Sequence, residues 1–218
     1  MDSLIRLVRV PALITLGVTL LRLIGELQGW SPALFNREAG GGGALVGIAW
    51  LAPIFGIYFA LRLSQSGTAH IKAGKTFLYA VAGLAAFFVI GFGGLRALGL
   101  NANKPSFASL VIFVLASLVA GIIAYAGSPA LGKVIFAYGL AARIPVALLM
   151  LAAMFGNWGT HYDVAPPGFP GMGLFAKWLI IGLVPQLTLW VAYTMVLGCL
   201  CGGIALALFR RKPALQPA

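Results

Sequence analysis

The chain has 218 residues, of which 61% are hydrophobic and only 9% are charged, and its mean hydropathy is +1.01. Soluble domains carry roughly a quarter charged residues, so this composition excludes a water-soluble fold and predicts an all-α polytopic membrane protein. The formal net charge of +11 does not indicate nucleic-acid binding, because the basic residues stand at the ends of apolar segments rather than on one helix face.

Apolar segments long enough to cross a bilayer recur along the whole chain. A hydrocarbon core of about 30 Å needs roughly 20 helical residues, each rising about 1.5 Å. The segments that reach this length predict a bundle of about six transmembrane helices in one domain, residues 1–218. They lie at about residues 10–27, 44–63, 77–98, 107–125, 131–155 and 186–209.

The polar separators carry the signals of helix starts. Ser31-Pro32 and Ser128-Pro129 each place a capping residue before a proline, which the first turn of a helix tolerates. Ser106 stands directly before the fourth predicted span. We therefore expect helices to begin at these three positions.

The last apolar stretch, residues 174–209, is too long for one upright span. Its 36 residues would extend over about 54 Å as a helix. Pro185 lacks a backbone donor, so it is predicted to divide the stretch into an interfacial or re-entrant piece at residues 174–184 and the sixth span. A single, strongly tilted helix is the alternative.

The distribution of basic residues predicts that both termini are cytoplasmic (N-in/C-in). Lysine and arginine gather in cytoplasmic segments, and a bacterial inner membrane is the default location. The five tryptophans fall at or near the predicted outer side, as a one-sided aromatic belt. This orientation places nine basic residues inside (Arg6, Arg9, Arg62, Lys72, Lys75, Lys133, Arg210, Arg211, Lys212) and four outside (Arg37, Arg96, Lys104, Lys177).

A polar stripe runs along the first predicted span. Thr15, Thr19, Arg22 and Glu26 follow one another at steps of four, three and four residues, which places them on one helix face. Lipid does not accommodate such a face, so we expect it to look into the bundle or into a water-filled cavity. A simpler alternative is that Arg22 and Glu26 neutralise each other near the outer surface.

Arg143 stands near the middle of the fifth predicted span, about 21 Å along the helix from Pro129. A lone arginine at this depth is costly and requires a counter-charge. Glu26 and Asp163 are its candidate protein partners. An anionic ligand is the other candidate.

The loop of residues 156–163 holds the densest cluster of hydrogen-bonding side chains, among them Asn157, His161 and Asp163. A His161–Asp163 pair would handle protons, whereas the alternative is a rigid loop that only caps the bundle. Two such residues fall short of a metal signature, so we predict no metal site.

These polar groups define a candidate ligand-binding site rather than a catalytic one. We expect a small membrane protein that binds or transports an anionic solute or lipid head group through an outward-facing polar pocket between spans one and five. The expected partners are the bilayer and such an anion; no cofactor and no nucleic acid is predicted. The candidate ligand-binding residues are Arg143, Arg22, Glu26, Thr19, Asn157, His161 and Asp163.

Two other classes of function stay open. A structural or accessory subunit of a larger membrane complex would use small-residue helix faces, such as Ala116, Ala120 and Ala124 of the fourth span, for contacts with other membrane proteins or a second copy. Gly198-x-x-x-Gly202 is a small-residue motif that predicts helix packing rather than an active site. An intramembrane lipid-modifying enzyme needs an acid/base pair, which only His161 with Asp163, or Glu26, would supply. So small a constellation makes an enzyme the less favoured alternative.

Overall fold

The computed structural model describes residues 2–41, 44–67, 70–101, 103–169 and 171–209, and within these ranges the chain is all-helical, without strands. Six helical stretches are long and apolar enough to cross a membrane, which confirms the predicted number of spans and the multi-pass class. The long helices are α1 (Asp2–Leu27), α2 (Leu51–Gln65), α3 (Ala73–Ala97), α4 (Phe107–Gly127), α5 (Pro129–Gly156) and α8 (Leu189–Phe209). The basic residues 210–212 of the predicted inner side lie outside the described ranges.

Two of the three predicted helix starts are confirmed. Ser106 opens α4 with a reciprocal capping box that includes Ser109, and Pro129 occupies the first turn of α5. The prediction for Ser31-Pro32 is wrong, because these residues form a turn in which the Ser31 carbonyl accepts from the backbone of Leu34 and Phe35.

The second span begins later than predicted. Residues 44–47 are not helical, and Gly47 has extended backbone angles (φ −176°, ψ 161°). The helix starts with the short 3-10 turn η2 (Ile48–Trp50) and continues as α2. Apolar composition alone does not separate this extended approach from the helix after it.

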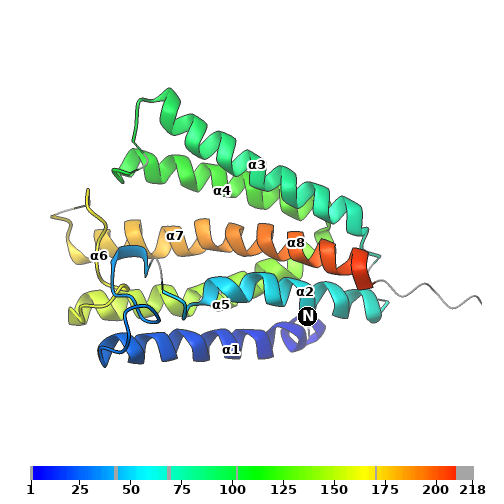
Figure 1. Ribbon diagram of the computed structural model, residues 1–218, viewed down its shortest axis with the longest axis horizontal. Helices are drawn as coiled ribbons and strands as arrows, with labels where there is room; N and C mark the ends of the chain where they lie inside the picture. Colours follow the sequence, from blue (N-terminus) through cyan, green and yellow to red (C-terminus); the bar gives the residue numbers. More distant parts are fainter. Residues whose placement is uncertain (1, 42–43, 68–69, 102, 170, 210–218) are drawn as a thin grey trace, which may run out of the picture.

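Residues 174–209 form one helical course with irregular hydrogen bonding. The π-helix η3 (Trp178–Leu183) follows α6 (Leu174–Lys177) and gives way to α7 (Val184–Leu187), which has Pro185 in its first turn. Thr188 lies between α7 and α8, which run end to end in Figure 1. Pro185 therefore marks a change of helix type without ending the helix, and an interfacial position for residues 174–184 stays a prediction.

Helix α8 is the centre of the bundle. It packs against α2, α3, α4 and α5, while α3 also packs on α4 and α1 packs on α5 (Figure 1). The contact between α2 and α8 is very close: a Cβ atom added to Gly56 would lie 2.3 Å from the Cα of Gly198. Gly202 faces the Gly56 carbonyl one turn further along, so the predicted small-residue motif is a helix-packing surface.

We expect Gly56→Ala to destabilise the protein, because the added methyl group has no space between α2 and α8. The cost should be about 1–3 kcal/mol, measured as a lower midpoint of thermal unfolding in detergent. Gly17→Ala is the matched control, since nothing lies within 4 Å of a Cβ added there. Equal melting of the two variants would contradict this close packing of α2 on α8.

Candidate functional site

A polar cavity of about 290 Å³ lies at the end of the bundle where α1, α3 and α5 finish, which we call the loop end. Its wall is built from α1, α5, the middle of the last helical course (α7 and the first turns of α8), and the segments before α2 and after α5. None of the described residues that line it is acidic. Its polar and aromatic lining residues are Thr19, Arg22, Trp50, Arg143, His161, Tyr162, Gln186, Trp190 and Tyr193.

Glu26, fully buried at the end of α1, ties this region together. Its carboxylate accepts from Arg22 Nε at 2.9 Å, which confirms the pairing of these two residues. It also accepts from the backbone N–H of His161 at 2.9 Å and contacts His161 Nδ1 at 2.5 Å. The side chain of Arg37 donates to the Glu26 carbonyl. Glu26 therefore links α1 to two loops, to the one after α5 through its carboxylate and to the one that holds Arg37 through its backbone carbonyl.

The polar face of α1 is turned toward protein, as its spacing predicts. Thr15 and Thr19 are both buried, and each hydroxyl donates to the carbonyl one turn earlier, of Pro11 and Thr15 respectively. The Thr15 hydroxyl also pairs with the Tyr138 hydroxyl of α5 at 2.8 Å. These bonds satisfy the threonines within the bundle, and of the four residues of this face only Thr19 and Arg22 line the polar cavity.

Arg143 of α5 is buried, with 5% of its surface exposed, and neither candidate carboxylate pairs with it. Its Nη1 donates to Gln186 Oε1 at a long 3.4 Å, and its guanidinium lies 4.6 Å from the centre of the Trp190 ring. Its Nε is buried without a hydrogen-bond partner in the described part of the chain. A buried cation with so few partners is energetically costly unless an anion joins it.

Asp163 stabilises the loop after α5 through hydrogen bonds within that loop. The Asp163 carboxylate accepts from the backbone of Gly159 at 2.9 Å, and from the backbone and hydroxyl of Thr160 at 2.7 Å each. Its carbonyl accepts from Lys177 at 2.6 Å. These contacts fit the alternative in which Asp163 stabilises a cap over the bundle.

Asn157 does not line the polar cavity. It is exposed and ends α5 in the left-handed conformation (φ 49°, ψ 55°), one that asparagine adopts more readily than most residues. Its position therefore assigns it to helix termination.

His161 lines the cavity and pairs with Glu26 instead of Asp163. Burial lowers the pKa of His161 below its ordinary value of 6.5, and the Arg22 charge lowers it further, against the opposing effect of Glu26. The imidazole is therefore neutral near pH 7, with its proton on the Nδ1 that faces the carboxylate. Nε2, the remaining basic nitrogen, makes no hydrogen bond to any described residue.

Sequence patterns did not predict the part of the cavity wall that comes from the last helical course. Gln186, Trp190 and Tyr193 come from the last helical course and face Arg143 or the space beside it. Gln186 is a buried amide in an apolar segment, which was a readable signal, because such polar groups in membrane helices mark functional or packing positions.

No known family model, curated protein or solved structure matches this chain. Among the described residues, no group of three His, Cys, Asp or Glu side chains comes together as a metal site would require. The case for function therefore depends on the geometry of the polar cavity itself.

We expect the protein to lose thermal stability as the pH falls from 7.5 to 5.5. His161 has a lowered pKa in the folded state, so the unfolded chain takes up a proton first, near pH 6.5, and acid favours unfolding. Melting curves of His161→Gln should show a weaker pH dependence, whereas His70→Gln should behave as wild type, since His70 is exposed. Identical pH profiles for wild type and His161→Gln would contradict a neutral, buried imidazole.

Proposed function

We propose that this protein binds an anionic group in the polar cavity, with Arg143 as the principal ligand-binding residue. The observation that carries the proposal is the buried Arg143 guanidinium, which has no carboxylate partner and an unpaired Nε in the described structure. An anion at this position would supply both the missing counter-charge and the missing acceptor.

A second cation supports an anionic ligand. Arg22 lines the same cavity, and its guanidinium is fixed by Glu26 and by the Asn36 carbonyl at 3.2 Å. Because Arg22 is already positioned, little side-chain entropy is lost when a ligand binds beside it. His161 and Tyr193 add hydrogen-bonding groups to the wall.

The chemistry of the arginines favours a ligand with a flat or branched array of oxygens, such as a carboxylate or phosphate. Guanidinium groups bind these anions through paired, nearly parallel hydrogen bonds, which a lysine ammonium does not reproduce. In the N-in/C-in orientation, the loop end lies on the outer side of the membrane. We therefore propose capture of an anion from that side, as a binding protein or as the first step of transport.

Removal of the Arg143 charge should separate binding from folding. We expect Arg143→Leu to keep or raise the melting temperature, because replacing a poorly paired buried charge with an apolar side chain removes a desolvation penalty. The same variant should weaken binding of glycerol 3-phosphate at least about tenfold, measured by calorimetry in nanodiscs. Arg143→Lys should bind with intermediate affinity.

The matched control is Arg96→Leu, which removes the same charge from an exposed position on α3. It should bind glycerol 3-phosphate as wild type does. A large loss of stability in Arg143→Leu, with unchanged anion binding, would make Arg143 structural and contradict the proposal. Native mass spectrometry that finds stable larger protein partners and no small ligand would favour the accessory-subunit alternative.

The Glu26–His161 pair favours lipid-modifying or hydrolytic chemistry as a second candidate function. A carboxylate that holds Nδ1–H of a neutral imidazole leaves Nε2 as a base, which is the arrangement that activates water or a hydroxyl in many hydrolases. Water would attack an ester carbon or phosphorus, its proton would pass to Nε2, and the leaving oxygen would then receive that proton. Arg143 would stabilise the negative charge that develops.

Ester hydrolysis tests this second candidate directly. We expect the wild type to hydrolyse p-nitrophenyl butyrate or p-nitrophenyl phosphate above the rate in buffer, and His161→Asn to lose about 10²- to 10⁴-fold of that rate. If the wild type hydrolyses neither probe faster than buffer does, the hydrolytic function is contradicted and only the binding function is supported.

A further inference from the structure

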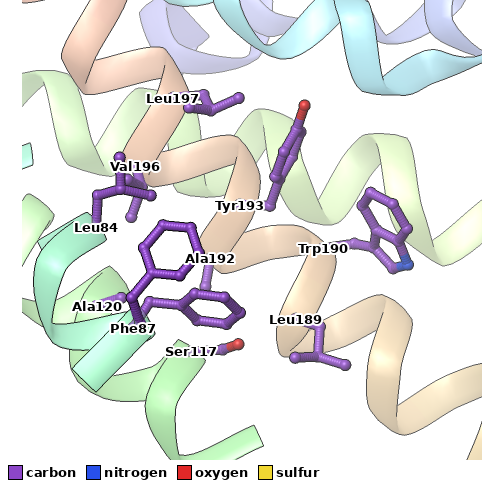
Figure 2. Close-up of a pocket in the computed structure, with 11 residues that line it drawn as sticks. Leu84, Phe87, Ser117, Ala120, Leu189, Trp190, Ala192, Tyr193, Val196 and Leu197 are labelled. Atoms are coloured by element: carbon purple, nitrogen blue, oxygen red, sulfur yellow. The ribbon is translucent and has the colours of Figure 1, made fainter. Parts of the chain in front are cut away.

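A second, apolar cavity of about 330 Å³ lies beside the polar one, between α3, α4 and α8. Figure 2 shows Leu84 and Phe87 of α3 on one side and Leu189 and Leu197 of α8 on the other. Its wall is almost entirely carbon, so it suits a hydrocarbon chain and no charged group.

The two cavities adjoin at two aromatic residues of α8. Trp190 and Tyr193 line both of them and extend from the helix backbone in Figure 2. The guanidinium of Arg143 lies over the ring of Trp190, so the cation and the apolar cavity are separated by a single side chain. Aromatic side chains with a polar edge are well suited to such a boundary between a polar and an apolar region.

We infer that the ligand is an anionic lipid, with its head group at Arg143 in the polar cavity and an acyl chain in the apolar cavity between α3, α4 and α8. This inference rests on the proposed anion binding and names the class of molecule bound. It follows from the position of the two cavities side by side, with Trp190 and Tyr193 in the wall of both. A water-soluble anion would use the polar cavity alone.

The apolar cavity provides space for the acyl chain but adds little to the binding free energy of the lipid. A hydrocarbon chain gains little by moving from lipid to an apolar protein surface, because the two environments are equally apolar. When the head group is drawn inward to Arg143, however, its chain must take a path that avoids polar protein atoms. The apolar cavity supplies this path, and the charge of the arginines then sets the affinity and the selectivity for anionic lipids.

The fold offers an internal control for this inference. A third cavity of about 300 Å³, also apolar, lies between α4, α5 and α8 and includes Leu118 and Ile122 in its wall. It shares no lining residue with the polar cavity. It does share Ser117 and Ala192 with the apolar cavity. Lipid in this third cavity touches none of the residues around Arg143, so we expect its occupancy to report general solvation by the bilayer.

Photolabelling in nanodiscs tests the inference. The probe is phosphatidic acid with a diazirine near the end of one acyl chain, in a phosphatidylcholine bilayer. We expect labels on α3 and α8 around Leu84 and Leu197, displaced by excess phosphatidic acid but not by added phosphatidylcholine. Arg143→Gln should reduce this labelling about tenfold and leave labelling around Leu118 and Ile122 unchanged.

A matched pair of cavity-filling variants supplies the second readout. Leu197→Trp fills the apolar cavity and should reduce the labelling of α3 at least about fivefold, whereas Leu118→Trp, in the third cavity, should not. Both variants should bind glycerol 3-phosphate as wild type does, because neither touches the polar cavity.

The outcomes distinguish this inference from the proposed function. If glycerol 3-phosphate binding depends on Arg143 while labelling around Leu197 does not, the ligand is a soluble anion and the lipid inference falls alone. If Arg143→Gln changes neither glycerol 3-phosphate binding nor the labelling around Leu197, both the lipid inference and the proposed anion binding are contradicted. Labelling that depends on Arg143 and is blocked by Leu197→Trp supports both, including the case in which glycerol 3-phosphate without a chain binds weakly.

Discussion

The buried carboxylate of Glu26 is the interaction on which the loop end depends. It holds Arg22 within α1 and receives both the backbone N–H and the ring Nδ1 of His161, a residue 135 positions away in the sequence. Within a bilayer, water is not available to satisfy such groups, so the partners must come from the protein. This carboxylate thereby fixes the loop after α5 over the end of α1, and it holds Arg22 and His161, which line the polar cavity.

The two buried carboxylates of this region have partners, whereas the buried cation Arg143 has no carboxylate partner among the described residues. Glu26 is fully engaged by Arg22 and His161, and Asp163 is occupied by the backbone of its own loop, which leaves Arg143 with an amide and an aromatic ring. The described cavity wall is consequently cationic, with no acidic residue in it. A protein that only needed a stable bundle would gain by placing an apolar residue at position 143, so the retained charge argues for a ligand.

Local patterns predicted the helices and the polar face of α1, but not which residues meet. Length and hydropathy identify spans well because a bilayer demands about 20 apolar residues in each. The steps of three and four residues likewise placed Thr15, Thr19, Arg22 and Glu26 on one face. The pairing of His161 with Glu26, and the wall formed by Gln186 and Trp190, depend on tertiary contacts across more than 40 residues, which no periodicity encodes.

The late start of α2 and the irregular course of the last span have a common consequence for the site. Ala44 and Gly47 of the non-helical segment before α2 line the cavity, and the π-helix before α7 shifts the register with which Gln186 and Trp190 face α5. Such insertions in membrane helices often mark functional positions, because one extra residue per turn rotates every later side chain. The departures from regular helix therefore fall where the polar cavity is built, while the closely packed helices α2 and α8 hold the frame around it.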